Sequence, residues 1–377
     1  MKKILVIFGT RPEAIKLAPV IIDLKKKIGK QVLVCSTGQH REMLRQVLDI
    51  FSLKIDFDLD LMKNNQDLFD ISSNSLNKLK KVYQEILPEL VIVQGDTTTA
   101  FIASLAAYYL KIKIAHVEAG LRSYNIYSPY PEEANRRFIS SIANYNFAPT
   151  NDSKNNLLKE GFQRNKIIVT GNTVIDALYL VSKRLIKVNK VKFVEKLKLP
   201  KELFDKKLVL ITLHRREKFG NEFKSLVETI KLLSIDYPEY NFIYPVHLNP
   251  NVKIPVEKNL SDLKNVFLLA PLGYLEFNFL MKKCHFIMTD SGGIQEECYF
   301  YKKPVMILRD VTERNEAIKA GYAFLLGSNS SKIINKFKDI DKKLKQNFNF
   351  FRVPNPFGDG KASQRITRFI TKNLQIK

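Results

Sequence analysis

The chain has 377 residues, of which 45% are hydrophobic, and its formal net charge is +23. This length exceeds what one hydrophobic core usually serves, so we expect two domains of roughly 150 to 200 residues. The positive charge is spread over many lysines without an arginine-and-aromatic stripe, which argues against nucleic acid or a lipid surface as the partner. A nucleic-acid binder remains an alternative suggested by charge alone.

The cysteine content and the apolar segments indicate the compartment. Cys35, Cys284 and Cys298 are too few and too scattered for a disulfide framework or a Cys-x-x-Cys metal site, which favours a reducing environment. The apolar run after Met1 is interrupted by Arg11 before it reaches the length of a signal peptide. No stretch of 18 apolar residues predicts a membrane span. We therefore expect a cytoplasmic protein with no membrane partner.

Short apolar runs alternate with helical patterns along the chain, which indicates an α/β fold of parallel strands covered by helices. Apolar residues at successive positions are typical of sheets that are buried on both faces. The expected strands of the first part lie at residues 3–8, 31–36, 89–94, 113–117, 145–149 and 166–170. Those of the second part lie at residues 208–213, 241–246, 265–270, 286–290, 304–308 and 323–327.

The expected domain boundary lies near residue 175. A helical pattern over residues 172–187 leads into a lysine-rich segment before the next strand begins. This predicts an N-terminal domain of residues 1–174 and a C-terminal domain of residues 175–377. The last segment, residues 362–377, predicts an amphipathic terminal helix.

The first strand is followed by a turn that places two cations and an anion at a helix start. Gly9 permits a sharp turn, and Pro12 suits a first helical position. The amides of a helix N-terminus attract negative charge, and Arg11 and Lys16 would reinforce this. An ordinary strand-to-helix loop needs Glu13 as a cap but requires neither cation. The turn therefore predicts an anion-binding site.

Ligands of open α/β sheets bind outside the carboxyl ends of the strands, so residues after each apolar run are functional candidates. Asp96 and Glu118 each follow a strand, and Glu132 lies at a helix start. Carboxyl groups that face one another in a closed cleft have their pKa values driven apart, which supplies an acid and a base. Each residue taken singly also has a structural explanation in place of a catalytic one. Asp96 could cap the helix that follows it, and Glu132 could stabilise the dipole of the helix that it begins.

The segment from Asp290 to Glu297 follows a strand and opens a helix. Gly292 and Gly293 let backbone amides approach a diphosphate, and Ser291 adds a hydroxyl donor. The two oxygens of Glu297 would bind ribose hydroxyls, unless its role is to stabilise the helix dipole. Arg314, after a later strand, is either a phosphate clamp or a surface charge.

The absence of several known motifs argues against three other kinds of site. No Gly-x-Gly-x-x-Gly follows the first strand, no spacing suggests a metal site, and no nucleophile elbow supports a Ser-His-Asp triad. We therefore expect no cofactor. His116 and His285 lie within strand-like runs and are expected to be structural, whereas His214 follows a strand and would meet a leaving phosphate as a proton donor or cation.

Nine motifs, in family order from residue 3 to about residue 368, resemble those of the non-hydrolysing UDP-N-acetylglucosamine 2-epimerases. The resemblance implies the GT-B fold, in which two Rossmann-like domains face a central cleft and the terminal helix packs back across the domains. It also implies reversible conversion of UDP-N-acetylglucosamine to UDP-N-acetylmannosamine, which feeds surface polysaccharide. The motifs are GTRPEAIK, GQHREML, QGDTTT, HVEAGLR, SPYPEEANRR, GNTVIDAL, HRRE, TDSGGIQEE and DVTERNEA.

The resemblance implies a role for each motif residue. The catalytic carboxylates would be Asp96, Glu118 and Glu132, and His214 would act on the leaving group. The substrate contacts would be Arg11, Lys16, Arg136, Phe277, Ser291, Gly292, Gly293, Glu297 and Arg314. The positions that bind a second, activating UDP-N-acetylglucosamine in some members are matched by Gln39, His40, Arg215 and His247. The enzyme is further expected to be a homodimer.

Two positions bear on the reaction and on the substrate. Hydrolysing relatives usually read Gly-Thr-Arg-Ala-Asp where this chain has Pro12 and Glu13, which disfavours hydrolysis. Some members place a polar residue at the position of Leu272, near the expected uracil site. The open alternatives are a 2-epimerase of another UDP-2-acetamido sugar and a GT-B glycosyltransferase, which would need an acceptor site.

Overall fold

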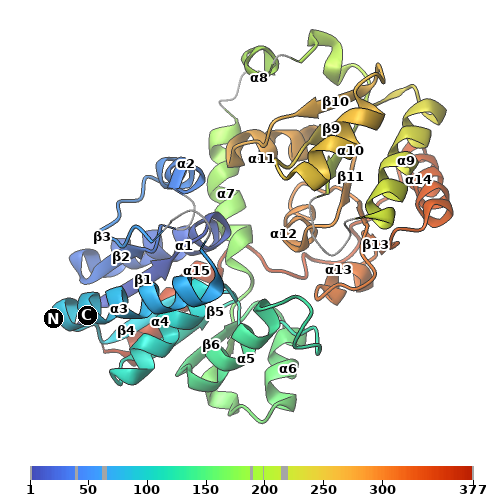
Figure 1. Ribbon diagram of the computed structural model, residues 1–377. Helices are drawn as coiled ribbons and strands as arrows, with labels where there is room; N and C mark the ends of the chain where they lie inside the picture. The colour runs from blue at the N-terminus through green and yellow to red at the C-terminus, as the bar shows by residue number, and fades with distance from the viewer. Residues whose placement is uncertain are drawn as a thin grey trace. The chain divides into compact units, whose positions relative to one another are not determined.

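The computed structural model describes residues 2–38, 41–61, 66–186, 190–197, 199–213 and 220–375. The chain forms two compact units (Figure 1). The first unit contains residues 1–181 and 357–377, and the second contains residues 182–356.

The first unit is built on a seven-stranded parallel sheet in the order β3-β2-β1-β4-β5-β6-β7. Its strands are β1 (Ile4–Phe8), β2 (Val32–Ser36), β3 (Phe57–Asp58), β4 (Leu90–Gln94), β5 (Lys113–Val117), β6 (Tyr145–Ala148) and β7 (Ile167–Val169). Every residue of β1 and β4 is buried, which explains their unbroken apolar runs. The strand order reverses between β1 and β4, and such a switch point is where ligands bind in this class of sheet.

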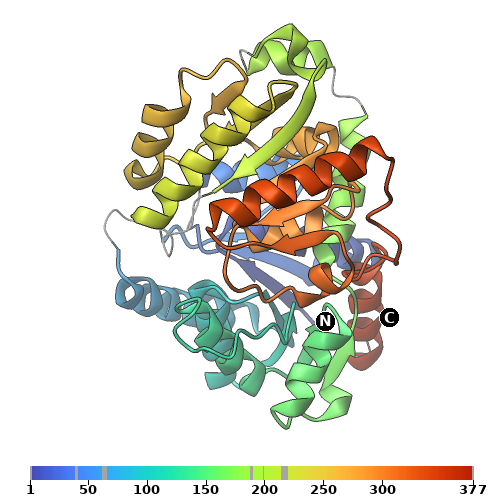
Figure 2. The same cartoon turned by 90° about the vertical axis from the view of Figure 1, so that its right-hand side faces the viewer.

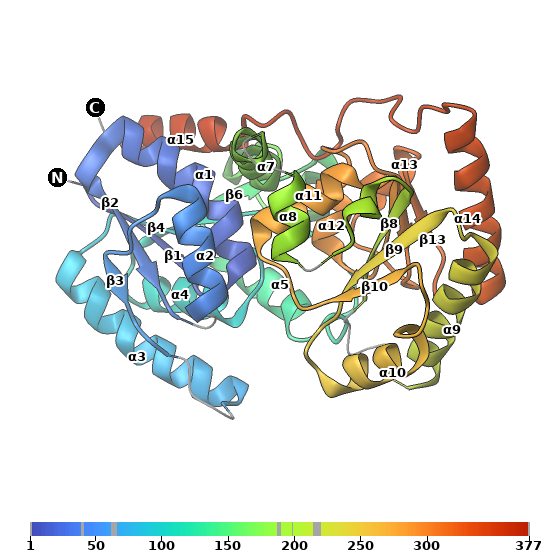
Figure 3. The same ribbon diagram turned by 90° about the horizontal axis from the view of Figure 1, so that it is seen from above.

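Helices cover both faces of this sheet. Figure 3 shows α1 and α15 on one side of the sheet and α3 and α4 on the other. The helices of the first unit are α1 (Arg11–Ile28), α2 (Arg41–Phe51), α3 (Leu68–Ile86), α4 (Thr98–Tyr109), α5 (Glu132–Ile142), α6 (Asn151–Lys159) and α15 (Ala362–Asn373), and α7 (Thr173–Leu185) leads into the second unit.

The second unit contains a six-stranded parallel sheet in the order β10-β9-β8-β11-β12-β13, with its switch point between β8 and β11. The strands are β8 (Lys207–Thr212), β9 (Tyr240–Pro245), β10 (Val266–Leu269), β11 (Phe286–Thr289), β12 (Val305–Ile307) and β13 (Ala323–Leu325). The helices are α8 (Lys190–Lys196), α9 (Asn221–Asp236), α10 (Pro250–Leu260), α11 (Tyr274–Lys283), α12 (Gly292–Glu297), α13 (Asn315–Lys319) and α14 (Ser330–Lys345).

These elements confirm the α/β prediction and all twelve predicted strands. The structure adds β3, whose two residues gave no apolar run. The predicted terminal helix is α15, and it packs against α1 in the first unit. The N-terminal and C-terminal segments accordingly lie beside each other in Figure 1, Figure 2 and Figure 3. Lys2 Nζ donates a hydrogen bond to Leu374 O (2.6 Å).

The first turn of α15 is held by Asp176 of α7. Its Oδ1 accepts hydrogen bonds from Ser363 N (2.9 Å) and Ser363 Oγ (2.7 Å), and its Oδ2 accepts one from Ala362 N (3.2 Å). Burial raises the pKa of this carboxyl, although the hydrogen bonds act in the opposite direction. The amides at the start of α15, which have no partners within the helix, thus find an acceptor on α7.

No helix in the described ranges is both long and apolar enough to cross a bilayer.

Candidate active site

The turn between β1 and α1 is held by the buried carboxylate of Glu13. Its Oε2 accepts hydrogen bonds from Gly9 N (3.0 Å) and Thr10 N (2.7 Å), and its Oε1 accepts one from Thr97 Oγ1 (2.6 Å). Burial raises the pKa of Glu13, while these hydrogen bonds oppose the shift. Glu13 therefore joins the turn after β1 to the turn after β4.

Gly9 is required by close packing. A Cβ at this position would overlap the side-chain oxygens of Thr37 and Thr99, which follow the neighbouring strands β2 and β4. The glycine therefore lets three adjacent strand ends approach one another at the switch point.

Glu118 directly follows β5 and has a φ of 66°, a left-handed conformation that is uncommon for a residue with a Cβ. Its Oε2 accepts hydrogen bonds from Lys16 Nζ (2.5 Å) and Gln94 Nε2 (3.1 Å). Both charged side chains are buried, and a buried charge is costly unless it is paired. Backbone strain held in place by such contacts is frequent at functional sites.

Asp96 follows β4 and is held by two residues of α5. Its Oδ2 lies 2.8 Å from Nε and 2.7 Å from Nη2 of Arg136, and its backbone carbonyl accepts a hydrogen bond from Asn135 Nδ2 (2.8 Å). The side chain of Asp96 remains 24% exposed, so it is accessible to a ligand. The capping alternative for Asp96 is wrong, because Thr97 caps α4 by accepting from Ala100 N (3.0 Å).

The start of α5 carries two adjacent carboxylates in different surroundings. Glu132 is the first residue of the helix and is partly buried. Glu133 has no accessible side-chain surface and accepts hydrogen bonds from Ser123 N (3.0 Å), Arg136 Nη1 (3.0 Å) and Arg137 Nε (3.3 Å). The sequence analysis did not single out Glu133, although its three- and four-residue spacing to the two arginines is a signal for helical ion pairs.

Gln94 was also missed. It is the last residue of β4 and the one polar residue of that strand. A polar side chain at the carboxyl end of an otherwise apolar, buried strand is the signal that would have found it.

In the second unit, the turn of residues 291–293 follows β11 at the predicted place. Ser291 N donates a hydrogen bond to Thr289 Oγ1 (2.9 Å), which in turn lies 2.6 Å from Thr212 Oγ1 at the end of β8. The turn is therefore tied to both strands of the switch point, where this class of sheet binds its ligand.

Arg314 lies directly against this turn. A Cβ on Gly292 would come within 2.7 Å of Arg314 Nη1, so a side chain there would require the guanidinium to move. The guanidinium donates to Glu296 Oε1 (3.0 Å) and Glu313 Oε2 (3.1 Å), and the residue is 8% exposed. Arg314 is thus a buried cation, and its interpretation as a surface charge is wrong.

Three other predicted site residues lie on different elements of the second unit. Glu297 is the last residue of α12, so the alternative that it stabilises the start of a helix is wrong. Phe277 is partly buried in α11, and His247 is exposed after β9, where its Nδ1 accepts from Asn249 N (3.1 Å). Four predicted residues lie outside the described ranges: Gln39, His40, His214 and Arg215.

His116 of β5 contacts the backbone of Gly95, the residue before Asp96. Its ring is fully buried, and Nε2 lies 2.7 Å from the carbonyl oxygen of Gly95. Burial, with a smaller contribution from Arg122, lowers the pKa of His116 to about 4. The structural role expected for His116 is therefore confirmed, and the ring is neutral at pH 7.

Two doubly wound units of this kind place the chain in the GT-B class of α/β proteins. The family model of UDP-N-acetylglucosamine 2-epimerase matches residues 23–371. The chain is 49% identical over 371 residues to the UDP-N-acetylglucosamine 2-epimerase of Neisseria meningitidis serogroup A, covering 98% of this chain and 100% of that protein. It is 46% identical over 375 residues to the enzyme of the same name from Campylobacter jejuni, covering 99% and 98%. The chain therefore belongs to the UDP-N-acetylglucosamine 2-epimerase family.

Two solved structures show the same architecture. The crystal structure of the Neisseria meningitidis enzyme bound to UDP-GlcNAc has a TM-score of 0.93 and 48% sequence identity, covering 98% of this chain and 100% of that one. The Methanocaldococcus jannaschii enzyme in complex with UDP-GlcNAc and UDP has a TM-score of 0.85 and 35% identity, covering 98% and 99%.

The buried His116 predicts a pH dependence of stability. Its pKa is about 4 in the folded protein and about 6.5 when unfolded, so the unfolded chain binds more protons between these values. This contribution to stability is fully present above pH 6.5 and is lost as the pH falls to 4. We expect the wild type to lose about 3 kcal/mol more than His116→Gln over this window. Urea unfolding at a series of pH values measures the difference, and parallel curves would contradict it.

Proposed function

We propose that the protein catalyses reversible epimerisation at C2 of UDP-N-acetylglucosamine to give UDP-N-acetylmannosamine. The observation that carries this proposal is the carboxyl edge of the first sheet, where Asp96 and Glu118 are each held by a buried cation. Two solved relatives support the substrate, since one was found bound to UDP-GlcNAc and the other in complex with UDP-GlcNAc and UDP.

The chemistry of the substrate favours an elimination. The proton on C2 has no adjacent carbonyl group to acidify it, so direct abstraction would leave an unstabilised carbanion. Departure of UDP from C1 builds oxocarbenium character that acidifies C2 while a carboxylate removes the proton. The intermediates would be 2-acetamidoglucal and UDP, and protonation of C2 from the opposite face followed by re-addition of UDP gives the epimer.

The proton transfers are assigned to Asp96, Glu118 and Glu132. The carboxylate of Asp96 is partly exposed and is held by Arg136, and one oxygen of Glu118 accepts hydrogen bonds from Lys16 and Gln94. Epimerisation needs a base to remove the C2 proton and an acid to return one from the other face, and carboxyl groups can fill both roles. The motif assigns His214 to the leaving group, with Arg11 as a further cation on the substrate.

Binding of the UDP part is assigned to the second unit. The amides of residues 291–293 and the buried guanidinium of Arg314 meet at one turn, which suits a diphosphate. Glu297 is assigned to the ribose hydroxyls and Phe277 to the uracil ring.

A second binding event is also proposed. Gln39, His40, Arg215 and His247 are assigned to an activating UDP-N-acetylglucosamine, on the resemblance of their motifs and on the exposed position of His247. Activation of this kind requires that the two ligands bind one state of the enzyme more tightly than another.

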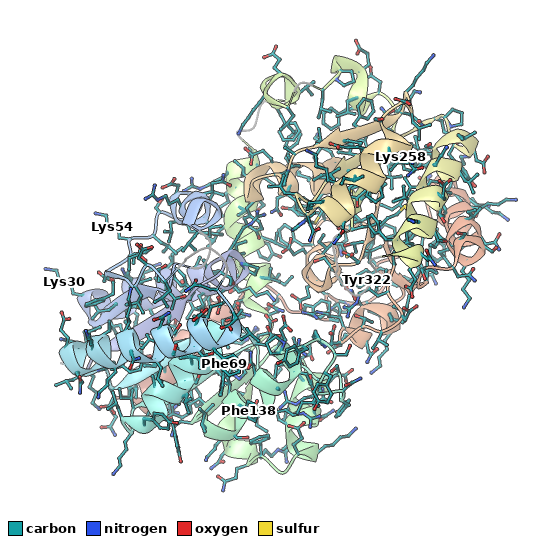
Figure 4. All side chains as sticks on the ribbon, viewed as in Figure 1. Lys30, Lys54, Phe69, Phe138, Lys258 and Tyr322 are labelled. Atoms are coloured by element: carbon teal, nitrogen blue, oxygen red, sulfur yellow. The ribbon has the colours of Figure 1, made fainter. Side chains whose placement is uncertain are left out.

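The enzyme is further proposed to be a homodimer. Large apolar side chains are exposed on three neighbouring helices of the first unit: Phe69 (84%) on α3, Tyr109 (64%) on α4 and Phe138 (50%) on α5. Phe69 and Phe138 project from this side of the molecule in Figure 4. Aromatic side chains are enriched at interfaces between subunits, so these three are candidate contact residues. A monomeric mass in sedimentation equilibrium would contradict the proposal.

A cytoplasmic location belongs to the same proposal. The three cysteines are free thiols in the interior, and burial raises the pKa of each. Unreactive, reduced thiols suit a reducing compartment, and cell fractionation tests the location.

Two alternatives share the fold. An epimerase of another UDP-2-acetamido sugar would bind UDP in the same way, and a glycosyltransferase would need an acceptor. Proton NMR of the protein with UDP-N-acetylglucosamine alone separates these possibilities. We expect UDP-N-acetylmannosamine to appear without an acceptor, with turnover roughly 100-fold or more lower for Asp96→Asn and for Glu118→Gln. The matched control is Asp49→Asn, an exposed carboxylate of α2, and equal rates in all variants would contradict the assignment.

UDP binding gives a second prediction. Glu297→Ala removes a carboxylate from the ribose hydroxyls and should cost roughly 1 to 3 kcal/mol of binding free energy for UDP. Calorimetry measures it, with Glu228→Ala on the exposed side of α9 as the control. An unchanged affinity for UDP would remove Glu297 from the site.

Activation gives a third prediction. The reverse reaction from pure UDP-N-acetylmannosamine should start slowly and accelerate when a trace of UDP-N-acetylglucosamine is added. A His247→Ala variant should stay slow, and its rate should not respond to the trace. Hyperbolic kinetics of the wild type with no lag would show that these residues serve another purpose.

A further inference from the structure

Glu133 is the most completely buried carboxylate at the carboxyl edge of the first sheet, and it is not one of the three carboxylates proposed to transfer protons. Its side chain has no accessible surface. Its two oxygens receive three N–H groups: Ser123 N and Arg136 Nη1 on Oε2, and Arg137 Nε on Oε1. A buried anion with this many donors is a fixed point, because moving it would leave several polar groups unpaired.

Two of the three donors connect Glu133 to other parts of the site. Ser123 belongs to the segment that follows Glu118, so its hydrogen bond connects α5 to the strand end of β5. Arg136 reaches the turn after β4, where it binds Asp96. Glu133 therefore connects the two segments that carry the candidate catalytic carboxylates.

The geometry of Arg136 shows what Glu133 does. The guanidinium is planar and rigid, and it is held at two edges by carboxylates. One edge, through Nε and Nη2, lies on Asp96, and Nη1 lies on Glu133. Because the guanidinium of Arg136 is bound on both edges, its plane cannot rotate. Glu133 therefore sets the position of Asp96 relative to α5 through Arg136.

A second ion pair of the first unit, between a buried arginine and a partly exposed carboxylate, provides the comparison. Arg122 donates to both oxygens of Glu160 at 2.8 and 2.7 Å, and its side chain has no accessible surface. This pair has the same chemistry and lies in the same unit, but the hydrogen bonds of Arg122 go to Leu121, Ser140 and Glu160 rather than to Asp96. It stabilises the fold without holding a candidate catalytic group.

We propose that Glu133 is a positioning residue, which acts through Arg136 to hold Asp96 in the orientation that proton transfer requires. The inference rests on the proposed function, because Asp96 is its target. Glu133 touches no substrate, so its loss should lower kcat and leave the binding of UDP unchanged.

A double-mutant cycle tests this. The rates of the wild type, Glu133→Gln, Asp96→Asn and the double variant are compared, and Glu160→Gln replaces Glu133→Gln in a control cycle on an arginine-bound carboxylate that does not contact Asp96. We expect Glu133→Gln to lower kcat roughly 10- to 100-fold, as misplacement of a reacting group does, with little change in KM. In the Asp96→Asn background the same change should lower kcat no further, since residues that act as a unit are not additive.

The outcomes separate this inference from the proposed function. No epimerisation by the wild type would refute the function itself. An active wild type, in which the effects of Glu133→Gln and Asp96→Asn multiply as those of the Glu160→Gln control do, would show that Glu133 is only structural. Calorimetric titration with UDP reports the folded fraction of every variant. If Glu133→Gln is not folded, the same cycle with Glu133→Asp, which keeps the charge, decides by the same criterion.

Discussion

A buried carboxylate must be surrounded by N–H and O–H donors, and in the first unit this constraint connects the strand ends that carry the candidate catalytic residues. Glu13 takes donors from the turns after β1 and β4, and Glu118 takes them from α1 and β4. Glu133 adds α5 and the segment after β5. Three carboxylates therefore bind the carboxyl edge of the sheet into one framework, and Asp96 is the partly exposed acid within it.

In the second unit the buried charge that needs partners is a cation, Arg314. Arg314 is buried between Glu296 and Glu313, and these two carboxylates hold its guanidinium against the turn of residues 291–293. Because the guanidinium is held in this way, the proposed binding of a diphosphate would need little ordering of Arg314. Gly292 is essential to this arrangement, since any side chain there would displace the guanidinium.

Much of this could be predicted from the sequence, because buried parallel strands are unbroken apolar runs and their carboxyl ends are the functional edge. That logic found all twelve longer strands and placed Asp96, Glu118 and the turn of residues 291–293. It could not find contacts between distant segments, such as the bond between Arg136 and Asp96, which are 40 residues apart. The amphipathic pattern of α15 likewise predicted a helix but not that it packs against α1. The left-handed backbone of Glu118 could not be predicted from its residue type.

The central claim is that carboxylates at the edge of the first sheet exchange the C2 proton of the sugar with solvent during elimination and re-addition of UDP. Incubating the enzyme with UDP-N-acetylglucosamine in deuterium oxide tests this most directly, with proton NMR and mass spectrometry of the UDP-N-acetylmannosamine formed. The account predicts one deuterium at C2 in product from the first turnovers. Product that retains the original C2 proton would contradict it.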